Sequence, residues 1–239
     1  MPPRLHVGAP LRANLTLALP DAAARHAQVL RLQPGSEITL FDGHGGEWAA
    51  RIESMGKREV TATALQHQAV ERELPCHVTL ALAMPSGERM DFVVEKATEL
   101  GAARIVPLIS ERSVLRLSGE RADKRRAHWQ AIAVAACEQC GRNRVPEVGA
   151  PQPLAAWLGT LSERADDEQR CLLGWRDARP WSAASAATVI TLSGPEGGFT
   201  ADEEALALSR GFVTVTLGAR VLRADTAPLA VMAALSLHR

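Results

Sequence analysis

Two apolar runs separated by a helical pattern constrain the fold of this chain more than any other feature. Residues 78–83 are apolar except for Thr79, and residues 89–100 repeat apolar side chains at helical spacing. Residues 104–108 form a second run that is apolar after Arg104. Short runs of this kind are typical of strands buried on both faces. A strand, a helix and a strand in this order predict a parallel pair joined by a right-handed crossover.

The same alternation continues to the end of the chain. We expect helices at about 120–142, near 154–158 and from Asp225 onward, and strands at 170–173, 188–192 and 213–217. Thr200 and Glu203 have the spacing of a capping box, so a further helix should begin directly after Thr200. We therefore predict a parallel α/β domain over residues 73–239.

The first part of the chain has a different pattern. Short β-forming segments occur at 15–17, 37–41, 47–52 and 60–65, with one short helix at 22–30. The glycine-rich cluster at 42–46 indicates a hairpin. A small barrel closes such strands without leaving open edges, so we predict a β-barrel domain over residues 1–72. Residues 66–75 alternate in charge and suit a linker.

Composition limits the possible partners. The 239 residues carry no formal net charge, so nucleic-acid binding requires local basic patches. Aromatic residues make up 4% and Tyr is absent, which disfavours modules that stack RNA bases on a sheet. We see neither an apolar run near the ~18 residues of a membrane span nor a signal-peptide core, and expect a cytoplasmic protein without membrane partners.

The cysteines do not predict a metal site. Cys137 and Cys140 have metal-like spacing, but Cys76 and Cys171 stand alone and supply no second pair. Because the Cys137 segment lies in an expected helix, we interpret these residues as structural thiols and expect no metal.

Two glycine-containing turns follow predicted strands and indicate a ligand pocket. The first spans Ser193–Phe199 and the second Leu217–Ala227. Ligands of open α/β sheets bind at the carboxyl ends of strands, so two such turns suggest one shared pocket. The alternative is that Gly197 and Gly198 only permit a tight turn with close helix packing.

The first turn does not have the pattern of a phosphate site. It lacks the G-x-G-x-x-G spacing of dinucleotide sites and the Gly-Lys-Ser/Thr of a P-loop. The carboxylate of Glu196 would repel a phosphate held by the loop amides. A ligand without phosphate and with positive charge fits better, and S-adenosylmethionine, with its cationic sulfonium, meets that description.

Several further segments together resemble one known family. With the two turns, the order and spacing of these segments are similar to the RsmE family of the SPOUT superfamily, whose members make 3-methyluridine in small-subunit ribosomal RNA. The segments are Arg4, His26–Arg31, Phe41–Gly43, Glu95–Gly101, Glu111–Ser113 and Ala136–Pro146.

The resemblance implies a PUA-like β-barrel at the amino end and a carboxyl-terminal SPOUT domain threaded as a trefoil knot. It also implies a homodimer acting on 16S rRNA, within the small ribosomal subunit, with the pocket close to the subunit interface. The implied S-adenosylmethionine pocket comprises Leu173, Gly174, Gly194, Glu196, Gly197, Leu217, Gly218, Val221, Leu222 and Thr226.

The chain departs from the usual family pattern at a few positions. Ala219 replaces a common proline, Ala224 and Asp225 replace a common Thr-Glu pair, and Ser86 stands where a basic residue is often found. Asp225 keeps a carboxylate on a shorter side chain. None of these replacements removes a glycine of the two turns.

Arg223 is the candidate catalytic residue. The N3 atom of uridine must lose its proton before or as it attacks the methyl group, and a nearby cation stabilises the resulting anion. Arg223 should border the methyl group because it lies in the second turn. The alternative is that Arg223 is held in an ion pair with Asp225 or Glu196. The sequence shows no dedicated general base.

Candidate RNA contacts lie on both domains: Arg4, Arg12, His26 and Arg31 on the first, and Arg112 and Arg116 on the second, where six basic residues fall between Arg112 and Arg126. Phosphate contacts would explain this local surplus and make binding salt-dependent. For 121–126 a solvated helix face is an equal alternative. His26 could instead be a barrel residue satisfied by a backbone carbonyl.

Three rival functions remain open at this point. A SPOUT enzyme could act on a ribose hydroxyl or a guanine nitrogen, a nicotinamide-dependent oxidoreductase could use the same pocket, and a non-catalytic module could bind RNA alone. The missing pyrophosphate fingerprint argues against the oxidoreductase. The barrel and the segments at Arg4 and His26–Arg31 favour the uridine enzyme.

Overall fold

The structure is a computed structural model that describes residues 2–85, 89–174, 178–182 and 186–237. The chain divides into two compact units. Unit 1 comprises Met1–Glu73 and Val134–Val145, and unit 2 comprises Leu74–Ala133 and Pro146–Arg239. None of the described helices is long and apolar enough to cross a membrane.

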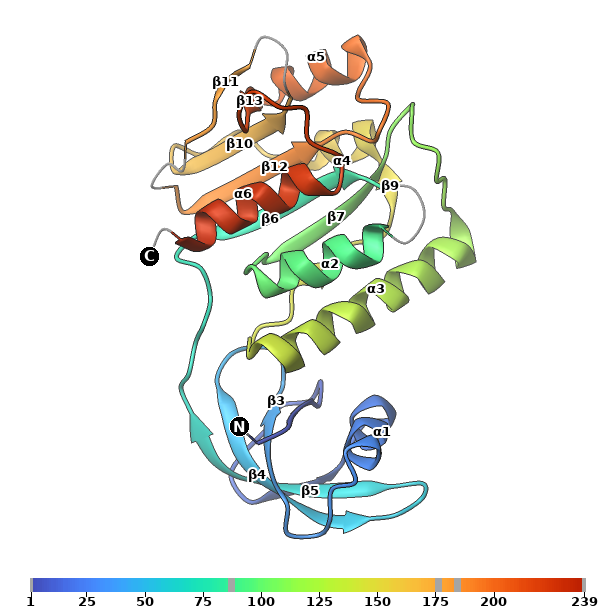
Figure 1. Cartoon of the computed structure of the whole chain (residues 1–239), viewed down its shortest axis with the longest axis vertical. Coiled ribbons are helices and arrows are strands. Elements are labelled where there is room, and N and C mark those ends of the chain that lie inside the picture. Colours follow the sequence, from blue (N-terminus) through green and yellow to red (C-terminus); the bar gives the residue numbers. More distant parts are fainter. Residues whose placement is uncertain (1, 86–88, 175–177, 183–185, 238–239) are drawn as a thin grey trace. The chain divides into compact units, whose positions relative to one another are not determined.

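Unit 1 contains a five-stranded sheet in the order β1-β3-β4-β5-β2 (Figure 1). Helix α1 (Asp21–Val29) packs its alanines against the core, which includes Leu5, Ile38 and Ile52. β1 pairs with β3 in parallel, and the remaining pairs are antiparallel. The strands are β1 (Arg4–His6), β2 (Leu15–Ala18), β3 (Glu37–Phe41), β4 (Glu47–Met55) and β5 (Val60–Gln68).

The strands predicted for this unit are present, and β1 is an addition to them. Its three residues, Arg4, Leu5 and His6, include two polar side chains, so no apolar pattern marks it as a strand. β5 also continues to Gln68, into the segment expected to be a linker.

Unit 2 contains an eight-stranded sheet in which all pairs are parallel. The order is β11-β13-β10-β12-β6-β7-β8, and β9 also pairs with β7. The elements are β6 (His77–Ala83), α2 (Arg89–Glu99), β7 (Arg104–Ile109), α3 (Gly119–Cys140), β8 (Glu147–Val148), β9 (Gln152–Pro153), α4 (Leu154–Thr160), β10 (Glu168–Leu173), β11 (Arg179–Pro180), β12 (Thr188–Ser193), α5 (Ala201–Ser209), β13 (Val213–Thr216) and α6 (Thr226–Leu237).

Helices cover both faces of this sheet. α2 and α6 pack together on one face, and α4 and α5 pack together on the other (Figure 1). Because successive strand residues point to opposite faces, alternate residues such as Val106 and Leu108 join Trp157 and Phe212 in one core cluster. The predicted parallel α/β architecture is therefore present.

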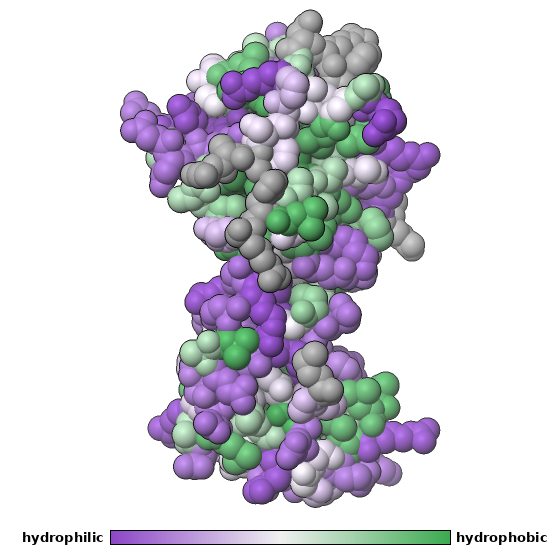
Figure 2. Space-filling view, turned by 60° about the vertical axis from the view of Figure 1, so that its left-hand side comes forward, coloured by the Kyte–Doolittle hydropathy of each residue, from purple (hydrophilic) through white to green (hydrophobic). Residues whose placement is uncertain are grey.

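Some large apolar side chains of unit 2 stay at its surface. Phe92 on α2 is 51% exposed, Val221 in the second turn 67% and Leu237 at the end of α6 83%. Figure 2 shows hydrophobic residues at the surface of this unit among hydrophilic ones.

The predicted capping box at the start of α5 is confirmed. The hydroxyl of Thr200 accepts a hydrogen bond from the amide of Glu203 at 3.2 Å, and the Glu203 carboxylate accepts one from the amide of Thr200 at 2.9 Å. The helix therefore begins directly after the glycine turn. The same carboxylate accepts the amide of Glu111 at 2.8 Å, which ties the segment after β7 to this helix.

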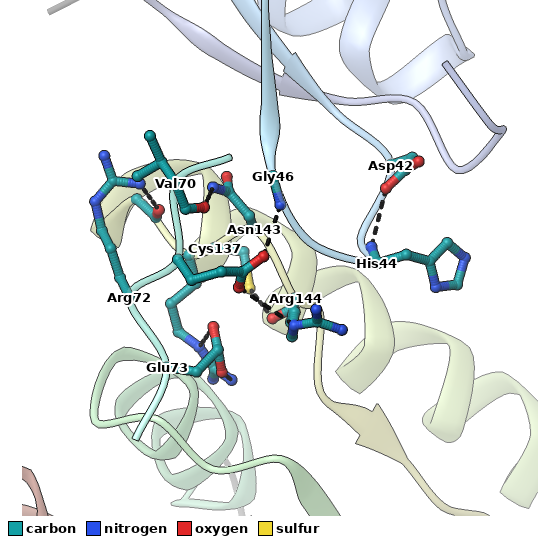
Figure 3. A network of polar contacts seen from close by, with 12 residues as sticks. Asp42, His44, Gly46, Val70, Arg72, Glu73, Cys137, Asn143 and Arg144 are labelled. Atoms are coloured by element: carbon teal, nitrogen blue, oxygen red, sulfur yellow. Dashed lines mark hydrogen bonds and ion pairs between the residues drawn. The ribbon is translucent and has the colours of Figure 1, made fainter. Parts of the chain in front are cut away.

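A polar network within unit 1 holds the segment that ends α3 against the strands. Asn143 donates to the carbonyl of Val70 at 2.7 Å, and Arg72 donates to the carbonyl of Gly141 at 2.8 Å (Figure 3). Arg142 and Glu73 form a further ion pair. These contacts join residues about seventy positions apart, so no local pattern in the sequence marks 134–145 as part of unit 1.

Arg4 lies at the centre of this network. Its guanidinium is 2.6 Å from a carboxylate oxygen of Glu47 and 2.6 Å from the side-chain oxygen of Asn143, and it lies over the ring of Phe41. Burial raises the pKa of Glu47, but hydrogen bonds from Arg72 and Arg4 outweigh burial and leave the pKa below its ordinary 4.5. Glu47 therefore stabilises the fold above that pH, and its contribution is lost as the pH falls through the lowered pKa.

Replacing Arg4 by Met should lower the free energy of unfolding by about 3 kcal/mol, because the buried carboxylate of Glu47 loses a partner. Arg72 still reaches Glu47, so we expect the lower end of the range for buried pairs. Urea denaturation at neutral pH measures the change. As a control, Arg51→Met removes an exposed ion pair with Glu53 and should cost less than about 1 kcal/mol. Equal losses in the two variants would contradict the buried role of Arg4.

Candidate functional site

The strand order brings the two glycine-containing turns to one edge of the sheet. β10 lies between β12 and β13, and Leu173 is in register with Ser193 on one side and Val215 on the other. Because the strands are parallel, the chain leaves all of them at the same edge. The turn after β12 and the turn after β13 therefore start on either side of Gly174.

A cleft of about 70 Å³ opens at this edge. Its lining includes five residues that the sequence assigned to the cofactor pocket, namely Leu173, Gly174, Leu217, Val221 and Leu222. Thr216, Arg220 and Ala227 complete it. These three were not predicted, although each lies within or next to the second turn and Arg220 is one of its two cations.

The other predicted cofactor residues lie outside this cleft. Gly194, Glu196 and Gly197 belong to the first turn, and Thr226 opens α6 and lines a different pocket of about 470 Å³. Gly218 follows Leu217 in the second turn. The structure thus brings one half of the predicted set together as cleft walls and places the other half in the neighbouring turns.

Two glycines are required by the backbone of these turns. Gly218 has a φ of +118°, a conformation that other residues avoid. At Gly194 a side chain would come within 3.3 Å of the backbone of Gly198 and of the Phe199 ring. Substitution at Gly218 would strain the second turn, and a side chain at Gly194 would require its neighbours in the first turn to shift slightly.

The lining suits a ligand with an apolar surface and hydrogen-bonding edges. The walls are largely aliphatic, from Leu173, Leu217 and Leu222. Within the residues that the structure describes, the amides of Gly218, Val221 and Leu222 donate to no protein acceptor. Free backbone donors beside aliphatic walls are groups of the kind that an adenine requires.

The two carboxylates that could have captured Arg223 contact another arginine. Nη1 of Arg89 is 3.1 Å from Oε1 of Glu196, and Nε of Arg89 is 4.0 Å from Oδ2 of Asp225. Arg223 itself is exposed, and its carbonyl accepts the amides of Thr226 and Ala227 at the start of α6. Among the described residues the alternative ion pair of Arg223 is therefore not formed.

Arg89 was not among the predicted site residues. It opens α2, more than a hundred residues before Glu196, and the helical pattern there indicates only a helix start. The available signal was charge, since Arg89 follows β6 at the sheet edge where each of the two turns carries one carboxylate, Glu196 or Asp225.

Arg112 contacts the first turn rather than standing free in solvent. Its guanidinium donates to the carbonyl of Gly197 at 2.9 Å and to the carbonyl of Phe199 at 3.2 Å. The side chain predicted to contact RNA thus also supports the backbone of the glycine turn. Arg116 is exposed and donates to the carbonyl of Glu111 at 2.9 Å.

In unit 1 the predicted RNA residues have different environments. Arg4 is 8% exposed and its guanidinium is held by Glu47 and Asn143, so burial gives it a structural role in place of the predicted RNA contact. Arg12 and Arg31 are exposed. The His26 side chain is 40% exposed, and its Nδ1 lies 3.1 Å from the carboxylate of Glu138, not beside a backbone carbonyl.

The remaining expectations concern the cysteines and Ser86. The Cys137 thiol is buried, burial raises its pKa to about 12, and its sulfur donates to the carbonyl of Arg144 at 3.6 Å. A thiol held neutral in this way supports the structural interpretation. Ser86 lies outside the described residues.

Comparison with known proteins gives two family matches. The family model for an RNA methyltransferase domain matches residues 72–236, and the model for an RNA methyltransferase PUA domain matches residues 19–65. The chain is also 35% identical over 225 residues to the ribosomal RNA small subunit methyltransferase E of Synechocystis. That match covers 91% of this chain and 72% of the relative.

Two solved structures are similar over the whole chain. One is a ribosomal RNA small subunit methyltransferase E from Neisseria gonorrhoeae bound to S-adenosyl methionine, with 38% identity and a TM-score of 0.91. The other is a methyltransferase from Legionella pneumophila in complex with the same cofactor, with 34% identity and a TM-score of 0.93. Each comparison covers 100% of this chain and 98% of the other. The prediction of a parallel α/β methyltransferase domain after a PUA-like domain is confirmed.

Proposed function

The chain belongs to the ribosomal RNA small subunit methyltransferase E family of RNA methyltransferases, and from this membership we propose that it methylates N3 of a uridine in 16S rRNA with S-adenosylmethionine as the methyl donor. The observation that carries the proposal is the cleft at the edge of β10 and β13, where five predicted cofactor residues meet and whose wall residue Leu222 directly precedes Arg223. The two similar structures bind this cofactor.

Each turn has a task in this reaction. Bound S-adenosylmethionine supplies a methyl group activated by a positively charged sulfur. The aliphatic walls Leu173, Leu217 and Leu222 would hold its adenine, and the free amides of the second turn would donate hydrogen bonds to it. The first turn, with Gly194, Glu196 and Gly197, follows β12, which pairs with β10 and ends at the same sheet edge. Holding both reactants in place supplies a large part of the rate.

Arg223 is the proposed catalytic residue. The uridine N3 carries a proton that must leave before the nitrogen can form a bond to carbon, and the anion that remains needs a positive partner. Arg223 is exposed immediately after Leu222, a residue of the cleft wall, and its neighbouring carboxylates contact Arg89. Its guanidinium is therefore available to stabilise the uridine anion as it forms.

RNA binding is proposed for the exposed basic residues of both units. These are Arg12, Arg31 and the partly exposed His26 in unit 1, and Arg112 and Arg116 in unit 2. Contacts of such residues to phosphates would make the affinity for RNA strongly salt-dependent, although the chain has zero net charge.

We place the enzyme in the cytoplasm, where it acts on rRNA within the small ribosomal subunit.

The enzyme is also proposed to act as a homodimer through the apolar groove between α2 and α6. This pocket of about 470 Å³ is lined by apolar side chains that include Phe92, Leu100 and Leu229, next to Asp225 and Thr226 of the second turn. A second copy seated there would cover the half-exposed Phe92 and border the cofactor site.

The substrate assignment is tested by mapping modified nucleosides by mass spectrometry. Purified protein and S-adenosylmethionine are incubated with unmodified small ribosomal subunits and, separately, with free 16S rRNA. We expect one 3-methyluridine in the subunit rRNA. A methyl group on a ribose hydroxyl or a guanine nitrogen would assign a different reaction, and absence of methylation in both samples would reject the proposal.

Replacing Arg223 by Ala should lower kcat by at least about a hundredfold, because the uridine anion loses its positive partner. The dissociation constant of S-adenosylhomocysteine, measured by calorimetry, should stay within about threefold, since the cleft walls are intact. Arg210→Ala, at the exposed end of α5, is the matched control and should leave both quantities unchanged. An equal loss of cofactor affinity and activity in Arg223→Ala would make Arg223 a structural residue.

Replacing Phe92 by Glu should convert the dimer into a monomer, because a charge in the groove opposes burial against a second copy. Sedimentation velocity measures the mass at a fixed protein concentration. Val114→Glu changes an exposed apolar residue outside this groove and should leave the dimer intact. A monomeric unmodified protein would exclude the proposed assembly.

A further inference from the structure

Arg89 joins the two turns of the site through their carboxylates. Its guanidinium is 3.1 Å from Glu196 in the turn after β12 and 4.0 Å from Asp225 in the turn after β13. Because the arginine opens α2, three segments far apart in the sequence meet at one side chain. An arginine suits this place, since its planar fork has donors for more than one acceptor.

The position of Asp225 is defined on both sides of its carboxylate. Oδ1 accepts the hydroxyl of Thr226 at 3.2 Å, while Oδ2 points toward Arg89. The residue immediately precedes α6, whose positive end favours a carboxylate there. Only 19% of the Asp225 side chain is exposed, so this carboxylate is less screened by water than those on the open surface.

Asp225 also lies two residues from Arg223, the proposed catalytic cation. A carboxylate that close in the chain is the natural competitor for the guanidinium of Arg223. If Arg223 were paired with Asp225, its charge would already be neutralised and it would stabilise the uridine anion less. In the structure the carboxylate of Asp225 faces Arg89 instead. The carboxylate of Glu196, in the first turn, also pairs with Arg89.

We propose that Arg89 is a positioning residue of the methyl-transfer site, which engages Asp225 and Glu196 and thereby leaves Arg223 available to the uridine. This inference rests on the proposed function of Arg223. It adds a second requirement to the site, since the catalytic cation needs another cation, on α2, to engage the acidic groups around it.

The ion pairs themselves add little to the stability of the fold. The side chains of Arg89 and Glu196 are 40% and 37% exposed, and pairs exposed to that degree contribute little once water screens them. A variant without the guanidinium should therefore fold. Its effect should be seen in the reaction, where a small displacement of a charged group has a large influence on rate.

The test compares Arg89→Met with the double variant Arg89→Met/Asp225→Asn. We expect Arg89→Met to lower kcat about tenfold, because Asp225 then captures Arg223, while calorimetry shows the affinity for S-adenosylhomocysteine within about threefold of the unmodified enzyme. Removing the competing carboxylate in the double variant should restore most of kcat. Arg89→Lys, which keeps the charge, should retain most of it.

A matched control is Arg104→Met, which removes an exposed arginine paired with Glu147 at 3.4 Å in the same unit and should leave kcat unchanged. A double variant no faster than Arg89→Met would overturn the inference, since the carboxylate would not be the cause of the loss. A loss of cofactor affinity that accounts for the whole effect would overturn it as well. If Arg223→Ala keeps full activity, the proposed function of Arg223 fails, whatever Arg89→Met shows.

Discussion

The site depends on the pairing of β10 with a parallel strand on each side. Leu173 is in register with Ser193 of β12 and with Val215 of β13, although these two residues are more than twenty positions apart in the sequence. Parallel strands in register end together, so the chain turns away from all three at one edge. The cleft, the free amides of the second turn and the position of Arg223 all follow from that register.

Two arginines from other parts of unit 2 hold the turns that follow β12 and β13. Arg112 holds the first turn by the carbonyls of Gly197 and Phe199, and Arg89 reaches a carboxylate on each turn. The two act differently, because Arg112 donates hydrogen bonds to backbone carbonyls of the first turn, whereas Arg89 neutralises the charge of carboxylates. The flexible glycines that let the turns approach each other are thus restrained by side chains from other parts of the unit.

The sequence was a good guide to everything that has a local pattern. The strand, helix and strand alternation, the capping box at Thr200 and the aliphatic wall at Leu217 and Leu222 follow from residues close together in the chain. The contacts of Arg4 and Arg89 do not, because each joins segments that only the folded chain brings together. For the same reason the sequence did not indicate that 134–145 belongs with the first seventy-three residues.

The arginines show that residue type alone does not distinguish a side chain that contacts RNA from one that stabilises the fold. Arg4, Arg112 and Arg31 have identical chemistry and all lie in segments that resemble the family, yet one is buried on Glu47, one supports a turn and one faces solvent. A guanidinium recognises carboxylates and carbonyls of the protein with the same fork that recognises phosphates. The deciding quantity is which acceptor the fold places within reach, so an arginine is a better RNA candidate when its neighbours supply no acceptor of their own. Within the described chain that criterion favours Arg12 and Arg31 for the substrate, and it assigns Arg4 and Arg89 to the enzyme itself.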